Sequence, residues 1–188
     1  HVVTRRQRQM CIRDRISGDG EKLFIYQSRI DSDEEIYYTS RDQDYYRLKP
    51  LEIFNTPSWE NHVTISADEK TLFFVSDRPG GLGGTDIWRC LKLPNGEWSK
   101  PFNLGPPINS SYNEQSPFIH PDGKTLYYSS DGEQSMGGYD IFFSKKIDNI
   151  KWSNPINMGF PLNTVDDDLF FTTSADGERG YYASNHEG

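Results

Sequence analysis

The segment HPDGKTLYYSSDGEQSMGGYDIF, residues 120–142, carries the clearest secondary-structure signals of this chain. It holds one short run rich in aromatic and β-branched residues, 125–129, then a glycine-rich segment, and then the start of a second such run, 140–144. Such runs, bounded by Gly, Pro, Asn or Asp, indicate β-strands. A shorter run precedes the turn Pro121-Asp122-Gly123, and a fourth follows at 152–158. The stretch therefore predicts one β-unit of four strands.

The unit returns along the chain at a constant spacing. The numbering advances by 54 from Asp68 to Asp122, and by the same step to Asp176. The same spacing separates Asp86 from Asp140 and Trp98 from Trp152. It also separates successive members of two longer series: Asn55, Asn109 and Asn163, and Glu60, Glu114 and Asp168. Periods of this size are typical of arrays in which one supersecondary unit is stacked on the next.

Two features predict how the strands are arranged. The run 72–75 (LFFV) is apolar on both faces, which indicates a strand covered from both sides. The fourth strand of the unit carries Pro101 or Pro155, and proline is confined to sheet edges. Buried middle strands and a proline-bearing edge favour a propeller blade over a sandwich. We predict an all-β, partial β-propeller: about three four-stranded antiparallel blades and the start of a fourth, in an open arc.

The blade limits follow from the period. We expect blades at about 16–64, 65–118 and 119–172, and an incomplete one at 173–188. Ten repeated positions are interpreted as structural: Asp19, Asp68, Asp122, Gly123, Asp176, Gly177, Asp86, Asp140, Trp98 and Trp152.

The turn between the first two strands of each unit has its own pattern. Asp122-Gly123 and Asp176-Gly177 place glycine where a positive φ is needed, as does Asp19-Gly20. Glu69 stands at this position in the second unit, so we predict a positive φ for a non-glycine residue there. These turns lack the dense alternating carboxylates of a calcium loop.

The N-terminal segment, residues 1–15, belongs to no repeat. The stretch 10–14 (MCIRD) resembles the conceptual translation of a transposon end used in sequencing libraries. We expect residues 1–15 to be extraneous and to pack against nothing. The alternative is a basic arm that binds nucleic acid or membrane. On this interpretation, residues 16–188 are a fragment of a larger propeller.

Charge and composition exclude several classes of protein. The formal net charge is −8, and residues 1–15 contribute five Arg and one Asp, so the remaining chain carries −12. Nucleic-acid binding is not expected for such a chain. No apolar stretch is long enough for a membrane span. Cys90 is the one cysteine outside the N-terminal segment.

The sequence offers no catalytic motif. The four histidines show no metal-ligand spacing, and there is no Gly-x-Ser-x-Gly elbow. The segment 80–84 (GGLGG) precedes a strand and not a helix, so we interpret it as a flexible connector and not as a phosphate loop. A glycosidase pair could be sought in Asp166, Asp167, Asp168 and Glu114, but the carboxylate recurs in every unit. We predict no enzyme activity, no metal and no cofactor.

A family resemblance supports these expectations. The runs 66–88 (SADEKTLFFVSDRPGGLGGTDIW) and 120–142 resemble the WD40-like propeller repeat of TolB-type periplasmic proteins. With 97–118 (EWSKPFNLGPPINSSYNEQSPF) between them, they are similar to repeats in OmpA-family envelope proteins of Bacteroidetes-type bacteria. The first unit departs, because it has 29–35 in place of the glycine-rich loop.

The resemblance implies a place in the cell and a role. It implies a periplasmic or outer-membrane-associated protein whose propeller docks an envelope protein, peptidoglycan or another glycan. The alternative is an accessory propeller of a hydrolase or peptidase whose catalytic domain lies outside this chain.

The candidate partner-binding residues lie in the connectors between units. They are Glu60, Glu114 and Asp168, with Asn55, Asn109 and Asn163 five positions before each. One hypothesis is that each side chain satisfies backbone N–H groups of its own connector. The other is an acidic rim that receives a basic peptide or a sugar-bearing partner.

Overall fold

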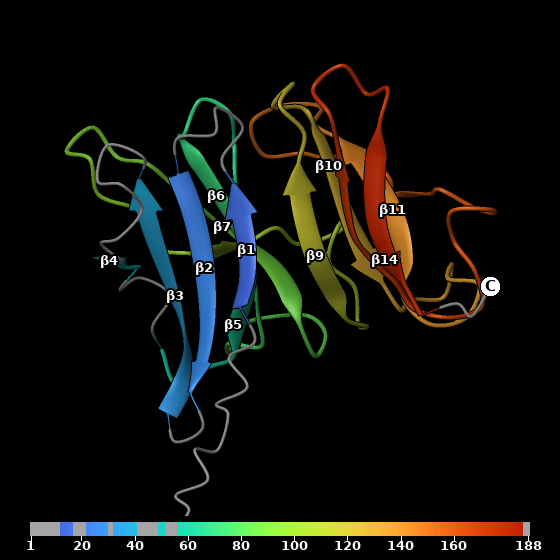
Figure 1. Ribbon diagram of the computed structural model, residues 1–188, viewed down its shortest axis with the longest axis horizontal. Coiled ribbons are helices and arrows are strands. Elements are labelled where there is room, and N and C mark those ends of the chain that lie inside the picture. Colours follow the sequence, from blue (N-terminus) through green and yellow to red (C-terminus); the bar gives the residue numbers. More distant parts are fainter. Residues whose placement is uncertain (1–11, 17–21, 30–31, 41–48, 52–55, 186–188) are drawn as a thin grey trace, which may run out of the picture.

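The computed structural model describes residues 12–16, 22–29, 32–40, 49–51 and 56–185, which form a row of antiparallel sheets (Figure 1). The first sheet contains β1 (Ile12–Ile16), β2 (Lys22–Arg29), β3 (Ser32–Ser40) and β4 (Lys49–Pro50). The second contains β5 (Glu60–Ile65), β6 (Thr71–Ser76), β7 (Asp86–Leu91) and β8 (Phe102–Asn103). The third contains β9 (Glu114–Ile119), β10 (Thr125–Ser130), β11 (Asp140–Lys145) and β12 (Ile156–Asn157). A two-stranded sheet follows, with β13 (Asp168–Thr173) and β14 (Gly180–Ser184).

Each four-stranded sheet is a meander, in which sequence neighbours are also neighbours in space. The sheets stand face to face in an open arc, and the inner strands β5, β9 and β13 contact one another. The prediction of an all-β partial propeller is confirmed.

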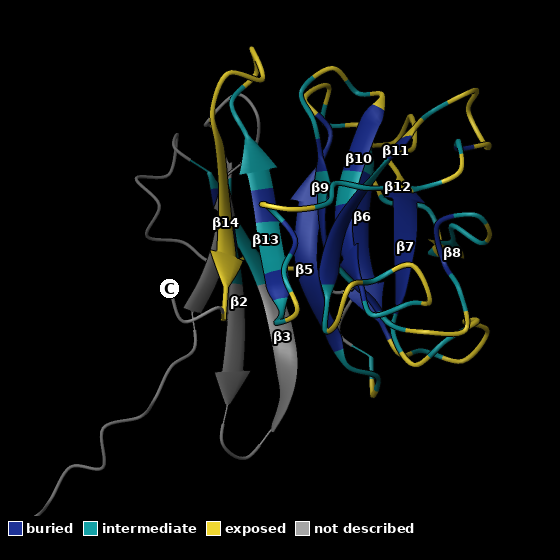
Figure 2. Ribbon diagram, turned by 90° about the vertical axis from the view of Figure 1, so that its right-hand side faces the viewer, coloured by how far each residue is buried: buried dark blue, intermediate teal, exposed yellow. Residues whose placement is uncertain are grey.

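The middle strands are buried on both faces, as the sequence predicts. On β6, Leu72 and Phe74 pack into a core shared with the first sheet, whereas Phe73 and Val75 pack into a core shared with the third. All four side chains are at most 3% exposed. Figure 2 shows the same burial along β5, β6 and β7. Burying a side chain of this size stabilises the fold by about 1.5–3 kcal/mol, so stacking of sheets provides much of the stability.

The outer strands are short and exposed. β8 and β12 follow Pro101 and Pro155 and contain two residues each, with Phe102 and Ile156 exposed. A proline cannot donate a ladder hydrogen bond, which ends the pairing at this edge. Trp98 and Trp152 lie just before these strands, each in an isolated bridge to the end of the third strand.

The glycine-rich loop is a packing device, which corrects its interpretation as a flexible connector. A Cβ on Gly83 would overlap with the carbonyl oxygen of Tyr112, and one on Gly137 with that of Val165. In both cases the obstacle is the connector that leads into the next sheet. The glycines are therefore needed because backbone meets backbone at the contact between units.

The turn prediction is confirmed at Glu69, whose φ is 56°, beside 67° for Gly123 and 74° for Gly177. The aspartates before them accept hydrogen bonds within the turn; Asp122, for example, accepts from the N–H groups of Lys124 and Thr125 at 2.7 and 2.9 Å. Asp19 and Gly20 lie outside the described residues.

A second set of positive φ angles has no signature in the sequence. His62, Ser116 and Phe170 have φ of 51°, 51° and 60°, and each lies at a register shift in the innermost strand of its sheet. These are β-bulges, which bend and twist a strand. The ring of His62 meets that of Phe170 edge-on at 4.9 Å, so the bulges of separate sheets come together.

The blade limits drawn from the sequence differ from the limits of the sheets. The sheets begin at Glu60, Glu114 and Asp168, so the expected limits at 65 and 119 fall at the ends of first strands and not before them.

The prediction that residues 1–15 pack against nothing is wrong for 12–15, which pair with β2. Backbone donors and acceptors can complete a sheet edge whatever the side chains. Residues 1–11 lie outside the described part.

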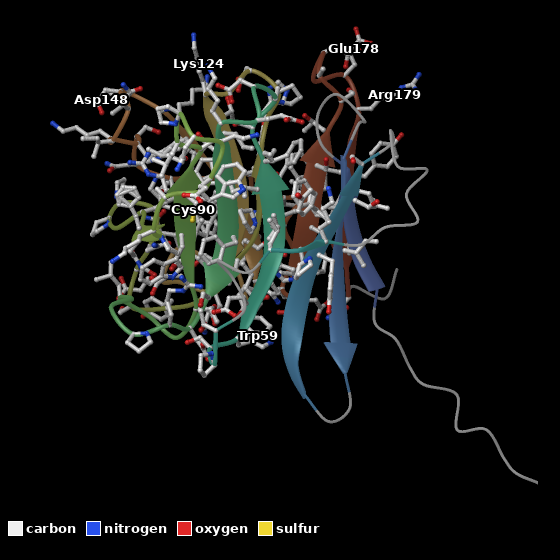
Figure 3. The ribbon with its side chains drawn as sticks, turned by 90° about the vertical axis from the view of Figure 1, so that its left-hand side faces the viewer. Trp59, Cys90, Lys124, Asp148, Glu178 and Arg179 are labelled. Carbon is white, nitrogen blue, oxygen red and sulfur yellow. The ribbon has the colours of Figure 1, made fainter. Side chains whose placement is uncertain are left out.

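Two further findings concern the described residues alone. None of them forms a helix that is long and apolar enough to cross a membrane. Cys90 is a buried free thiol among the interior side chains, whereas Lys124 and Asp148 lie at the periphery (Figure 3). Burial raises the pKa of the Cys90 thiol to about 12, so the reactive thiolate form is disfavoured there.

Candidate functional site

Glu114 begins β9, and its carboxylate turns back onto the connector before the strand. Its Oε1 accepts a hydrogen bond from the Ser110 hydroxyl at 2.6 Å, and its Oε2 accepts one from the Ser110 N–H at 3.2 Å. The Ser130 hydroxyl on β10 donates to Oε1 at 3.3 Å. The carboxylate therefore fixes the connector against two strands of the third sheet.

Glu60 and Asp168 repeat this arrangement. Asp168 Oδ2 accepts from the N–H and the hydroxyl of Thr164 at 2.6 and 3.0 Å, and Glu60 Oε1 accepts from the Thr56 hydroxyl. The exposed fractions of Glu60, Glu114 and Asp168 are 0%, 1% and 0%. The three carboxylates do not form an exposed acidic rim, because the connectors enclose them. Their geometry is the one that the connector-capping hypothesis describes.

Asn109 and Asn163 clamp the same connectors to the third strand of the preceding sheet. The Asn109 side chain accepts from the N–H of Ile87 and donates to its carbonyl, both at 2.9 Å. Asn163 makes the same two bonds to Ile141, again at 2.9 Å. Each amide thus behaves as one residue of an additional strand. Asn55 lies outside the described residues.

Asp86 and Asp140 hold the glycine-rich loops. Asp86 Oδ2 accepts from the N–H of Leu82 at 2.7 Å, and Asp140 Oδ2 accepts from the N–H of Met136 at 2.9 Å. Burial raises the pKa of Asp86. Both aspartates are buried, and their bonds support the structural role that the sequence suggests.

A cleft of about 480 Å³ opens above the carboxylate of Glu114. Its volume is in the range of small-ligand sites, roughly 300–1,000 Å³. The lining combines prolines, aromatic rings, hydroxyls and carboxylates: Pro107, Ser110, Tyr112, Glu114, Tyr128, Ser130, Gly132, Glu133, Phe142 and Pro155. The Tyr112 hydroxyl donates to Glu133 at 3.4 Å. The cleft can therefore offer a ligand ring faces, hydrogen-bond acceptors and negative charge.

The electrostatics of Glu114 follow from its burial. Its pKa is about 7: burial and, to a smaller extent, the negative charge of Asp86 raise it, while bonds from Ser110 and Ser130 lower it. Within the described ranges, no basic side chain forms an ion pair with Glu114. The carboxylate is enclosed without a counter-charge.

In the second sheet, the position equivalent to the cleft is filled by the side chain of Arg78. The Arg78 guanidinium donates to Glu60 Oε1 at 3.0 Å and from Nε to the Ser76 hydroxyl at 3.1 Å. Its central carbon lies 4.7 Å from the ring centroid of Phe74 and 5.5 Å from that of Trp88. The ion pair and the cation–π contacts together hold the guanidinium at a site where the Arg78 side chain is only 13% exposed.

Sequence reasoning finds Glu114 but misses the cleft above it. The aromatic residues Tyr128 and Phe142 lie in runs that predict packed strands, and no motif singles out Tyr112. The available signal is the change from Arg78 to Gly132 at one position of the repeat. This change indicates a cleft only when the groups that surround Arg78 are known.

The comparisons place the chain by its fold. No protein-family model matches it, and no curated protein does. TolB from Acinetobacter baumannii matches with a TM-score of 0.57 and 16% identity, over 93% of this chain and 37% of that chain. A putative TolB from Agrobacterium tumefaciens matches with a TM-score of 0.60 and 17% identity, over 94% of this chain and 59% of that chain.

A peptidase also matches. Oligopeptidase B from Trypanosoma brucei gives a TM-score of 0.55 at 10% identity, over 93% of this chain and 27% of that chain. This chain therefore spans less than two thirds of each of the three proteins. At these identities the likeness concerns the fold alone. The chain has the fold of a partial β-propeller, similar to those of TolB-type proteins and of an oligopeptidase.

Proposed function

We propose that this chain is a non-catalytic propeller module of an exported cell-envelope protein, and that it docks a protein or glycan partner. The observation that carries the proposal is the cleft of about 480 Å³ on the third sheet. A concave site with ring faces and a few polar groups is the usual form of a binding site. The similarity to two TolB structures supports the envelope setting.

The arrangement of the three repeated carboxylates supports a structural role for them over a catalytic one. Acid–base chemistry on a sugar needs two carboxylates that face one substrate. Here Glu60, Glu114 and Asp168 each bond to their own connector, and each belongs to a different sheet. Their repetition is explained by the fold.

The test is retention by envelope material. The purified chain is sedimented with peptidoglycan sacculi and, separately, with solubilised envelope proteins. Tyr112 lines the cleft and is 38% exposed, whereas Tyr182 is 43% exposed and is not among the lining residues. We expect the chain to be retained by one of the two materials, with Tyr112→Ala weakening retention and Tyr182→Ala leaving it unchanged. No retention by either material, or equal retention of both variants, contradicts the proposal.

The second candidate function is an accessory propeller of a peptidase or hydrolase. The similarity to oligopeptidase B favours it. In that case the complete protein hydrolyses a chromogenic peptide substrate, and this chain alone does not. A complete protein without hydrolase activity excludes this candidate.

A further inference from the structure

Gly132 is the third-sheet counterpart of Arg78. The two positions lie one repeat period apart and share a backbone contact. The N–H of Arg78 donates to the Ser76 hydroxyl at 3.1 Å, and the N–H of Gly132 donates to the Ser130 hydroxyl at 3.2 Å. The third sheet thus has a glycine where the second sheet has a guanidinium side chain.

The four side chains that contact the Arg78 guanidinium, and the Thr56 hydroxyl that bonds to Glu60, have counterparts around the cleft. The pairs, again one repeat period apart, are Thr56 and Ser110, Glu60 and Glu114, Phe74 and Tyr128, Ser76 and Ser130, and Trp88 and Phe142. All five third-sheet members line the cleft. The rings of Tyr128 and Phe142 are stacked, with centroids 6.1 Å apart and an angle of 22° between planes. The cleft therefore keeps the receptor groups and lacks the side chain that occupies them.

The charge of the cleft is suited to a cation from outside. Glu114 is 1% exposed, and the described residues give it no ion-pair partner. Glu133 adds a second carboxylate where it meets the Tyr112 hydroxyl. An entering cation would be attracted by both groups, as Arg78 is held by Glu60.

We propose that this cleft binds the guanidinium of an arginine side chain presented by a partner protein. The proposal rests on the proposed docking function and deepens it by naming the chemistry of one partner group. Arginine is favoured over lysine because a planar guanidinium stacks on rings while it donates to carboxylate and hydroxyl oxygens. A neutral sugar could stack on the rings but would leave the buried carboxylate without a counter-charge.

The direct test uses two short peptides that differ in one charge. The ¹⁵N-labelled chain is titrated with Ac-Gly-Arg-Gly-NH₂ and with the same peptide carrying citrulline, and the amide signals of Ser110 and Gly132 are followed. We expect the arginine peptide to shift these signals and the citrulline peptide to bind at least about tenfold more weakly. Equal binding of the two peptides, or binding of neither, overturns the proposal.

Two reciprocal variants locate the site. A Cβ on Gly132 meets the Ser130 hydroxyl at 3.3 Å and the Tyr112 ring at 3.7 Å, so Gly132→Arg can fill the cleft from within. It should abolish peptide binding, whereas Ile150→Arg, which adds the same charge at a position that is 74% exposed, should not. Arg78→Gly should create a second site and raise the stoichiometry from one to two. Unchanged binding in Gly132→Arg contradicts the proposal even where Arg78→Gly does not fold.

The two proposals fail in different ways. Arginine-peptide binding without retention by envelope material supports the cleft and contradicts the envelope-docking function. Retention without arginine-peptide binding does the reverse.

Discussion

The second and third sheets are built on one plan and treat the same buried carboxylate differently. Glu60 faces the Arg78 guanidinium, which opposes the rise in pKa that burial causes. Glu114 has hydroxyl and N–H donors but no cation among the described residues, and burial raises its pKa to about 7. The same scaffold therefore accommodates this buried acid in two ways. One is stabilised from within, and the other depends on protonation or on a partner.

Removing the internal cation should have the largest effect. Arg78→Ala leaves Glu60 buried and unpaired, so we expect the free energy of unfolding to fall by about 3 kcal/mol. Gly132→Ala changes the counterpart position without affecting an ion pair and should cost far less. Urea unfolding of both variants checks the comparison. A loss in Arg78→Ala no larger than that in Gly132→Ala would contradict a stabilising role for the ion pair.

The pH dependence of Glu114 gives the next effect. Its pKa is about 7 in the folded chain against an ordinary value of 4.5, so the folded state keeps a proton that the unfolded state releases. Its contribution to stability is present below about pH 4.5 and is lost as the pH rises through about 7. Glu114→Gln removes this loss.

The measurement is the difference in unfolding free energy between Glu114→Gln and the wild type at pH 4 and pH 8. It should shift in favour of the variant by up to about 3 kcal/mol over this range. Asp86, whose pKa burial also raises, is present in both proteins and enters the difference only through its coupling to Glu114. A pH-independent difference contradicts the assigned titration.

The glycine-rich loops should behave alike in the two sheets. Gly83→Ala and Gly137→Ala each force a Cβ against the backbone of the next connector, and we expect a loss of about 1–3 kcal/mol in each. Gly96 has open space around a Cβ but a positive φ of 86°, so Gly96→Ala reports the cost of φ without the clash. Losses at Gly83 and Gly137 no larger than at Gly96 would contradict the close-packing account.

The smallest effect is expected at the turns. Glu69 holds a φ of 56° where the third sheet has Gly123 at 67°. A non-glycine residue in this region costs about 1 kcal/mol. Glu69→Gly should therefore raise stability by up to that amount, less the added entropy of glycine in the unfolded chain. Gly123→Glu should lower it, and thermal denaturation of the pair measures both.

The parts of the fold that the sequence predicts are those with a local signature. The two-faced apolar run 72–75 predicts a buried strand, and Pro101 predicts an edge. The sequence does not predict the bulges at His62, Ser116 and Phe170, because ordinary residues adopt positive φ there under the constraint of neighbouring sheets. The packing role of the glycine-rich loop is not predicted either, because it depends on a contact between units.

The sequence likewise predicts some parts of the candidate site and not others. The spacing singles out Glu114 and Asn109, but it does not say that both are enclosed, since burial depends on how the connector folds over them. The cleft results from a side chain that Gly132 does not have. Such a feature is visible in sequence only after strand pairing shows which positions of the repeat surround it.

The asparagine clamps have a consequence for how this protein avoids joining its own copies. In the second sheet β8 has only two residues and pairs with Trp88 and Arg89, so the start of β7 at Ile87 lies beyond this short strand. Asn109 occupies both the N–H and the carbonyl of Ile87 at that edge. An edge already occupied cannot recruit a strand from another molecule. The side chains of Asn109 and Asn163 thus block strand addition at Ile87 and Ile141.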